Sequence, residues 1–442
     1  MAWSSCREQR LTESRQPGIG DKVKFLMVLP TSVAGGHHAL YGLAAAKAAQ
    51  ARGWRVDVAT PAFQLGHPTG RELERVVQAT GGRVVDIPPV KLKWHGTLGY
   101  LESQLRIWTL VRKAGRRAGR DLNYDIAYVN DGDSWYLPCL MLGSPIKKFR
   151  SVTVMLRIRH HHNRLSFDAA YPVRMGIVQR VAFACFLKSR SLLGVLVPDK
   201  PLVDYSLRHP NECGGKVHYV PDLGQSVHLI NREKARSLLG IEEQQQVILC
   251  IGSLDHRKGI TELVAGLAND RCSRFVTAML IGPTDAHLSS WLRSEVPANL
   301  IESGRLLVRD GVYNSEMLAT ALSAADGVWL GYRNHFGSSS VLWEAAQAGL
   351  PVLGRNKGLI AWEIRSNGIG TTVNIDDSEA VACALTELLG DETARAQWRR
   401  SALNIGPLHT AEAFGEAIIQ MISKSMSDAG TSLTRRDVET LA

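Results

Sequence analysis

The sequence predicts an α/β protein with two doubly wound parallel sheets, one in each half of the chain. Short apolar runs rich in β-branched residues alternate throughout with longer segments of helical period, which is typical of βαβ units with helices on both faces of a sheet. A chain of 442 residues is also too long for a single hydrophobic core. A stretch rich in Pro, Gly, Asn and Asp, at 200–225, separates the two series of runs.

Each half of the chain supplies six expected strands. In the first half they fall at 23–30, 54–60, 82–88, 124–130, 151–158 and 192–198. In the second half they fall at 246–252, 274–282, 306–311, 326–332, 350–354 and 370–375. Because the segments between them have helical length and period, each half should form one Rossmann-like sheet.

The domain boundaries follow from these runs. We expect a disordered extension over 1–20, an N-terminal domain over 21–205, a linker over 206–225, a C-terminal domain over 226–424 and a flexible tail over 425–442.

Composition narrows the compartment. No run of about 18 uncharged apolar residues occurs, and the first twenty residues lack the apolar stretch of a secretory signal. The seven cysteines are odd in number and show no CxxC spacing, so we interpret them as reduced packing residues. We therefore expect a cytoplasmic protein, with peripheral attachment to the cytoplasmic membrane face left open.

Positive charge is concentrated in the first half. Residues 1–200 carry 30 Lys and Arg against 14 Asp and Glu, a net charge of +16, whereas the remainder carries −6. The segment 91–120 is amphipathic and ends in several arginines. Such a half suits an anionic partner such as a phospholipid surface. A helix packed on the sheet with a solvated basic end, on an ordinary basic surface, is the alternative. Nucleic acid ranks last, because no basic module interleaved with aromatic residues is present.

A glycine turn follows the first strand. Gly35 and Gly36 precede an Ala-rich helix, and glycines at such a turn let backbone amides approach an anion at the positive helix end. An ordinary tight turn explains the same pair, because the segment is neither GxGxxG nor a P-loop.

The sharpest pattern follows the first strand of the second half. The turn at Gly252 and Ser253 leads to Arg257 and Lys258 before the next helix, so two cations join the positive helix end. This arrangement predicts a diphosphate site. A surface Arg-Lys pair beside a capping glycine is the alternative.

A second anion-binding turn is expected after 326–332. Gly337 and three serines, Ser338, Ser339 and Ser340, open a helix whose amides and hydroxyls can hold phosphate or sugar oxygens. Glu344 follows within two turns, where a carboxylate can accept hydrogen bonds from vicinal hydroxyls. Both turns lie at the carboxyl edge of the sheet, where open α/β sheets bind ligands. A serine cap followed by an exposed glutamate is the alternative.

In the order of these elements and motifs, the chain resembles glycosyltransferase family 4 (glycosyl transferases group 1) and its GT-B relatives. The resemblance covers roughly 22–424 and is strongest over 246–375, including the GS-x4-KG turn, LIGP and the segment GSSSVLWEAAQAGLPVL. It implies a GT-B fold and transfer of a sugar from a nucleotide diphosphate without a metal ion.

The resemblance also assigns roles on the donor side. It places Lys258 on the diphosphate, with Ser253 where an arginine is usual, so that Arg257 is the substitute. It places Glu344 on the ribose and counts Gly252 and Val341 with the donor-binding segments. The first glutamate of the family's Glu-x7-Glu pattern is missing, because Phe336 stands there, and His335 is among the nearest polar candidates.

The same resemblance implies that the nucleotide base contacts backbone groups near Val312.

Three consecutive histidines follow the fifth expected strand. The resemblance places one functional histidine, His161 or His162, near the transferred sugar or the acceptor, with His160 as an acceptor-side candidate. Metal binding is the weaker alternative, because consecutive side chains of an extended segment point to alternating sides.

Asp131 and Asp133 follow the fourth expected strand and are further acceptor-side candidates. They are similar to the DxD with which GT-A glycosyltransferases hold a metal. A helix N-cap at Asp133 is the other interpretation. The two-sheet order argues against metal, so none is expected.

We therefore expect a glycosyltransferase, and the resemblance implies that transfer retains the configuration of the sugar. The expected acceptor is a polysaccharide, a glycolipid or a small metabolite. A nucleotide-sugar epimerase on the same scaffold and a non-catalytic sugar-binding relative remain alternatives, the latter because of Phe336 and Ser253.

Overall fold

The computed structural model describes residues 22–30, 37–62, 66–90, 96–162, 176–311 and 314–439, without the side chains of His37, Asp121 and 428–439. The chain divides into two compact units. One comprises the residues up to 153 together with 189–194 and 415–442, and the other comprises 154–188 and 195–414.

The N-terminal half forms a seven-stranded sheet of order β3-β2-β1-β4-β5-β6-β7. Its strands are β1 (Lys24–Val28), β2 (Arg55–Thr60), β3 (Val84–Asp86), β4 (Ile126–Val129), β5 (Arg150–Val154), β6 (Leu192–Val197) and β7 (Val217–Tyr219). The chain order reverses between β1 and β4, which pair in parallel. That reversal is the topological switch point of a doubly wound sheet.

The second half forms a six-stranded sheet of order β10-β9-β8-β11-β12-β13. Its strands are β8 (Gln246–Ile251), β9 (Val276–Ile281), β10 (Leu306–Arg309), β11 (Gly327–Leu330), β12 (Val352–Arg355) and β13 (Gly370–Val373). Strand β8 is buried over its last five residues, because helices cover both faces of a parallel sheet. The switch point lies between β8 and β11.

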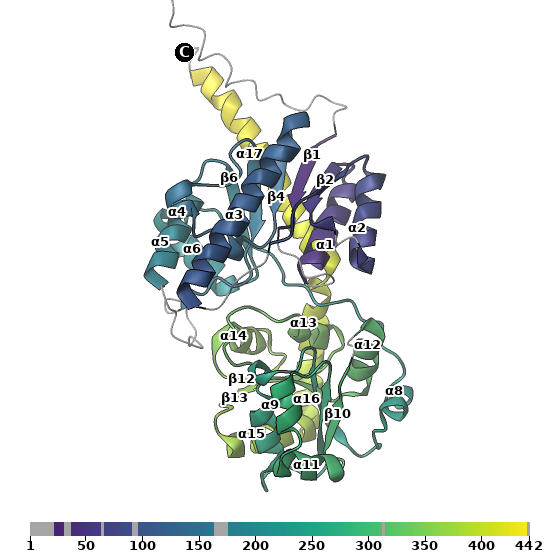
Figure 1. Cartoon of the computed structure of the whole chain (residues 1–442). Coiled ribbons are helices and arrows are strands. Elements are labelled where there is room, and N and C mark those ends of the chain that lie inside the picture. The colour runs from purple at the N-terminus through teal and green to yellow at the C-terminus, as the bar shows by residue number, and fades with distance from the viewer. Residues whose placement is uncertain are drawn as a thin grey trace, which may run out of the picture. The chain divides into compact units, whose positions relative to one another are not determined.

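Helices connect the strands in both halves (Figure 1). In the first half they are α1 (His37–Ala51), α2 (Pro68–Ala79), α3 (Gly96–Asp121), α4 (Cys139–Leu142), α5 (Gly176–Leu187), α6 (Lys200–Arg208) and α7 (Pro210–Cys213). In the second half they are α8 (Arg232–Leu239), α9 (Ile260–Ala268), α10 (Ala286–Trp291), α11 (Glu295–Glu302), α12 (Ser315–Ala324), α13 (Ser340–Gln347), α14 (Gly358–Asn367), α15 (Ser378–Gly390), α16 (Glu392–Ile405) and α17 (Ala411–Glu439). The predicted two-sheet α/β fold is confirmed.

The expected linker contains regular structure. Over 206–225 the chain completes α6, forms α7 and adds β7 to the first sheet, and an irregular segment follows over 220–231. The three residues of β7 are too short to show a strand pattern among prolines and glycines.

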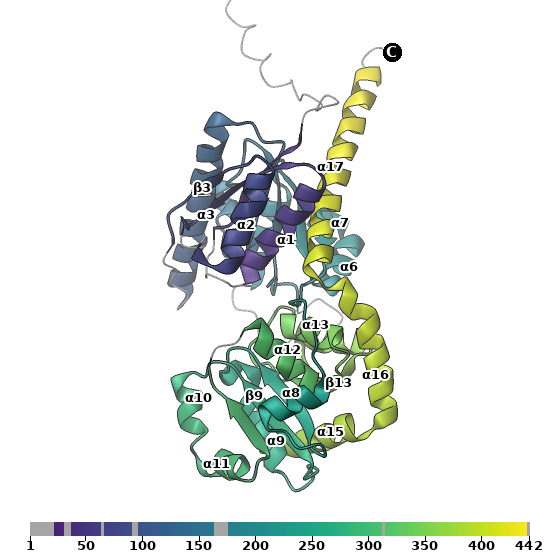
Figure 2. The same ribbon diagram turned by 90° about the vertical axis from the view of Figure 1, so that its right-hand side faces the viewer.

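The last helix groups with the first unit. Helix α17 extends to Glu439, through the segment expected to be a flexible tail. From Gly415 onward it belongs to the first unit, and it lies beside α1 (Figure 2). A side chain at Gly415 would come within 2.3 Å of the carbonyl oxygen of Ala44, so only glycine permits this approach. Arg52 of α1 also pairs with Glu416.

Six cysteines lie in the described part of the chain, and all of them are free. Cys139, Cys213, Cys250 and Cys272 are buried, as expected of packing residues, whereas Cys185 and Cys383 are exposed. A membrane-crossing helix would need a longer apolar stretch than any helix of the described segments offers.

Candidate functional site

Lys258 lies at the switch point of the second sheet. The chain leaves β8, forms a short 3-10 turn over His256–Lys258 and enters α9 after Gly259. The Nζ atom of Lys258 donates to the carbonyl oxygen of Ile251 at 2.6 Å and to the hydroxyl of Tyr332 at 3.2 Å. Its side chain is buried, so these contacts hold the ammonium in one place.

Gly259 lets the turn approach β11. Its φ is +64°, and a Cβ there would lie 2.1 Å from the carbonyl oxygen of Gly331. Trp329 of β11 donates through Nε1 to the carbonyl of Lys258 at 2.9 Å. The backbone of Lys258 is thus fixed against the end of β11.

Arg257 differs from its neighbour. Its guanidinium binds the carboxylate of Asp255, with Nε and Nη2 at 2.9 and 2.6 Å, and its side chain is about half exposed. Arg257 must give up this pair to reach a diphosphate. Ser253 is exposed on the same turn, and Gly252 has a φ of +96°.

The serine turn meets Lys258 through Tyr332. The hydroxyls of Tyr332 and Ser339 lie 3.3 Å apart. Tyr332 therefore links the ammonium to the N-terminus of α13, which begins at Ser340 with Ser339 at its N-cap. The two segments expected to hold a diphosphate come together at the carboxyl edge of the sheet. This edge is where amides of a helix N-terminus can receive an anion.

The residues before α13 are held within the protein. Nε2 of His335 donates to the carbonyl oxygen of Ser338 at 2.9 Å, and burial lowers the pKa of His335. The hydroxyl of Ser338 accepts from Nε1 of Trp343 and donates to Glu363, both at 3.0 Å. Val341 packs in the core, so only its backbone can face a ligand.

Glu363 lies on α14, and its side chain is buried. Burial raises the pKa of Glu363 well above its usual range. The hydrogen bond from Ser338 lowers this pKa, whereas the negative charge of Asp222 raises it further. Glu363 thus accepts the hydrogen bond that fixes Ser338, a role that the sequence pattern did not indicate.

Glu344 lies on α13 and is also buried, so the exposed-helix alternative is wrong. Its Oε1 atom accepts from the backbone amide of Gln225 at 3.3 Å. His409 fixes that coil, because its Nδ1 donates to the carbonyl of Asp222 at 2.8 Å and its ring stacks on Trp343 with centroids 3.3 Å apart.

We expect the free energy of unfolding of His409→Gln to fall less at acid pH than that of wild type. Burial lowers the pKa of His409 to about 4, whereas an unfolded histidine titrates near 6.5. The unfolded chain therefore binds the proton first. The contribution of His409 to the free energy of unfolding has its full value above about pH 6.5. It falls by about 3 kcal/mol as the pH drops to about 4.

Urea unfolding at pH 7 and pH 4.5 measures this effect. The loss of stability between the two should be about 2 to 3 kcal/mol smaller in His409→Gln than in wild type. His287→Gln, at an exposed position of α10, is the control. Parallel pH profiles for wild type and His409→Gln would contradict the prediction.

The three histidines occupy a turn rather than an extended segment. The amide of His162 donates to the carbonyl of Arg159, and all three side chains are buried. Nε2 of His162 lies 3.4 Å from the carboxylate of Asp199, which caps α6. His161 packs against Tyr205, with ring centroids 5.5 Å apart. Burial lowers the pKa of His160 well below its usual range.

Asp131 takes the N-cap position that was considered for Asp133. It precedes the 3-10 turn Gly132–Ser134, has a φ of 55°, and accepts from the hydroxyl of Ser134 at 2.6 Å. Asp133 lies inside the turn and is buried, so the cap interpretation for it is wrong. Asp131 stands at the carboxyl end of β4, at the first sheet's switch point.

Three expected donor residues, Gly35, Gly36 and Val312, lie outside the described residues. Within the described ranges, no three His, Cys, Asp or Glu side chains gather as metal ligands would.

Comparison with known proteins supports the resemblance to group 1 glycosyltransferases. Residues 231–404 match the family model described as glycosyl transferases group 1. Curated protein sequences contain no match to the chain.

Solved structures share the fold at low identity. Sucrose-phosphate synthase of Thermosynechococcus elongatus has a TM-score of 0.64 at 17% identity, over 92% of this chain and 100% of that chain. Anabaena HepE, solved in complex with UDP, has a TM-score of 0.63 at 18% identity, and the match covers 91% of this chain and 100% of that chain. WaaG, a glycosyltransferase involved in lipopolysaccharide biosynthesis, has a TM-score of 0.57 at 17% identity, and the match covers 90% of this chain and 99% of that chain.

The fold is therefore GT-B, and the resemblance to group 1 glycosyltransferases is confirmed. The matched segment contains the turn of Lys258 and helix α13. Tyr332 and Gln225 were missed in the sequence, although Tyr332 ends an expected strand.

Proposed function

We propose that this protein transfers a sugar, with retention, from a nucleoside diphosphate sugar to an acceptor glycan, glycolipid or small metabolite. The observation that carries the proposal is the link from Lys258 through Tyr332 to Ser339 at the switch point of the second sheet. There a buried ammonium and the amides of α13 can stabilise the charge that grows on the leaving diphosphate.

Glu344 and the histidine turn complete the proposal. Glu344, on the second turn of α13, accepts the ribose hydroxyls. One of His161 and His162 contacts the sugar or the acceptor, and Asp131 and Asp133 serve the acceptor side. Transfer needs no metal, because Lys258 supplies the positive charge. The basic N-terminal half attaches the enzyme peripherally to the cytoplasmic membrane face.

The solved relatives indicate which donor to test first. HepE has been solved with UDP, with UDP and glucose, and with UDP-glucose. UDP sugars are therefore the first donors to offer. WaaG's part in lipopolysaccharide biosynthesis supports including a glycolipid among the acceptors.

A thermal-shift screen with nucleoside diphosphates and nucleotide sugars tests the proposal. A ligand at 100 times its dissociation constant stabilises the folded state by about 2.7 kcal/mol, so the right nucleotide should raise Tm selectively. No response to any nucleotide would refute the proposal. If a donor binds but is converted to its epimer without acceptor, an epimerase is the better assignment. Loss of transfer in EDTA would refute metal independence.

A further inference from the structure

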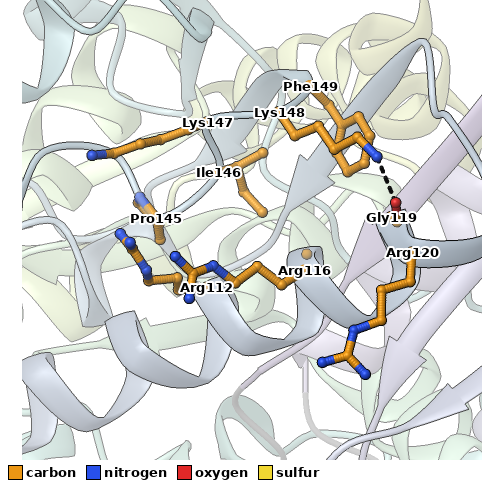
Figure 3. Close-up of a pocket in the computed structure, with 10 residues that line it drawn as sticks. Arg112, Arg116, Gly119, Arg120, Pro145, Ile146, Lys147, Lys148 and Phe149 are labelled. Atoms are coloured by element: carbon orange, nitrogen blue, oxygen red, sulfur yellow. Dashed lines mark hydrogen bonds between the residues drawn. The ribbon is translucent and has the colours of Figure 1, made fainter.

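A cavity of about 380 Å³ opens in the first unit, between the second half of α3 and the segment 145–149 that leads into β5 (Figure 3). Its volume lies within the range usual for small-molecule sites. Figure 3 shows the charged ends of Arg112, Arg116 and Lys147 on one side of the cavity. Lys148 turns instead to the carbonyl of Gly119, at 2.6 Å.

Two glycines of α3 bring its cations and those of the segment 145–149 to the same space. A Cβ at Gly115 would lie 2.6 Å from Cδ1 of Ile146, and one at Gly119 would lie 2.5 Å from Cζ of Phe149. The segment therefore packs directly on the helix, and larger residues at these positions would separate the two elements. This close packing brings Lys147 next to Arg112 and Arg116.

The charge in the cavity is not balanced by acidic groups. None of its ten lining residues is acidic, and among the described side chains no carboxylate pairs with Arg112, Arg116 or Lys147. On the adjacent face of α3, by contrast, Arg106 pairs with Glu102 and Arg117 donates to the carbonyl of Asp86. Like charges in one cavity repel each other, and a bound anion would relieve that repulsion.

The helix dipole does not account for the whole cluster. Cations favour the last turn of a helix, which explains Arg120 and the contact of Lys148. Arg112 and Arg116 lie one to two turns earlier. Guanidinium groups offer the planar set of donors that suits phosphate oxygens, and Lys147 adds a further positive charge.

The cavity is not part of the donor or acceptor site. The segment 145–149 precedes β5, so the cavity lies at the amino edge of the first sheet. Asp131, at the end of β4, marks the opposite edge, where ligands of doubly wound sheets bind. The cavity therefore lies away from the edge that carries Asp131.

We propose that Arg112, Arg116 and Lys147 form a second anion site, which binds a phosphate-bearing group. The group is either a soluble phosphate ester or polyphosphate, or the headgroup of an anionic lipid. Exposed Leu98, Leu101 and Leu105 continue the same face of α3 at helical spacing and favour the lipid source.

Two probes separate these sources: inorganic pyrophosphate, measured by calorimetry, and phosphatidylcholine vesicles with or without phosphatidylglycerol, measured by co-sedimentation. The test variant is Arg112→Gln/Arg116→Gln/Lys147→Gln. The control variant, Arg106→Gln/Lys113→Gln/Arg117→Gln, removes the same charge from the adjacent face of α3. At about 1 kcal/mol per cation, the test variant should bind on the order of 100-fold more weakly than the control.

A loss confined to pyrophosphate identifies a soluble ligand, and a loss confined to anionic vesicles identifies the lipid. Equal binding by the test and control variants, with both probes, would overturn the proposal. If the triple variant fails to fold, Lys147→Glu, at an exposed position, replaces it and should weaken binding at least about tenfold. UDP binding is measured in parallel, so failure here and failure of the transferase proposal are distinguishable.

Discussion

Lys258→Ala is expected to lower kcat for sugar transfer by about 100- to 1000-fold, the usual cost of removing one preorganised donor to a developing negative charge. The ammonium is buried and already held by Ile251 and Tyr332, so it needs little reorganisation when the diphosphate departs. Because its contribution grows with the charge on the leaving group, kcat should fall more than KM rises.

Matched variants separate chemistry from folding. Lys258→Met keeps the buried stem and loses only the charge, so it should show the same loss of kcat with a Tm closer to wild type. Lys234→Ala, at an exposed position of α8, removes a charge elsewhere and should leave kcat unchanged. Arg257→Ala should have a smaller effect than Lys258→Ala, because its guanidinium binds Asp255. Full activity in folded Lys258→Met would contradict the assignment of Lys258.

Glu344→Ala is expected to weaken UDP binding by about 10- to 100-fold. A hydrogen bond to a charged group contributes about 1.5 to 3 kcal/mol, and buried Glu344 would make such bonds to the ribose. Glu344→Gln, which keeps the shape, should lose somewhat less. Glu387→Gln, at an exposed position of α15, is the control.

UDP analogues that lack one ribose hydroxyl provide a sharper test of this prediction. Wild type should bind UDP more tightly than 2′-deoxy-UDP or 3′-deoxy-UDP, and Glu344→Ala should lose that preference. Calorimetry with the three ligands measures the coupling energy between the Glu344 side chain and each ribose hydroxyl. If Glu344→Ala discriminates among them as wild type does, Glu344 does not hold the ribose.

The sheets could be predicted because buried parallel strands are continuous apolar runs. All twelve expected strands appear, and in the described part of the chain β7 is the one strand that was missed. Candidate site residues could be proposed from the sequence only where a motif has a distinctive order, as at Lys258 and Glu344.

Contacts between distant segments left weaker traces in the sequence. Glu363 shares a helix face with Leu359 and Ile360, which is a sign of burial, but nothing local indicates Ser338 as its partner. The pair of Arg257 with Asp255 and the turn of the histidines depend on backbone geometry that residue types alone do not fix.

The position of α17 bears on how the chain folds during synthesis. The first unit takes its earlier segments from residues up to 153 and from 189–194, yet its last helix enters at Gly415, about 220 residues after the second of these. At about 5 to 20 residues per second, a ribosome needs roughly 10 to 50 s to make the intervening chain. During that time the surface of α1 around Ala44, which α17 covers in the finished unit, stays uncovered.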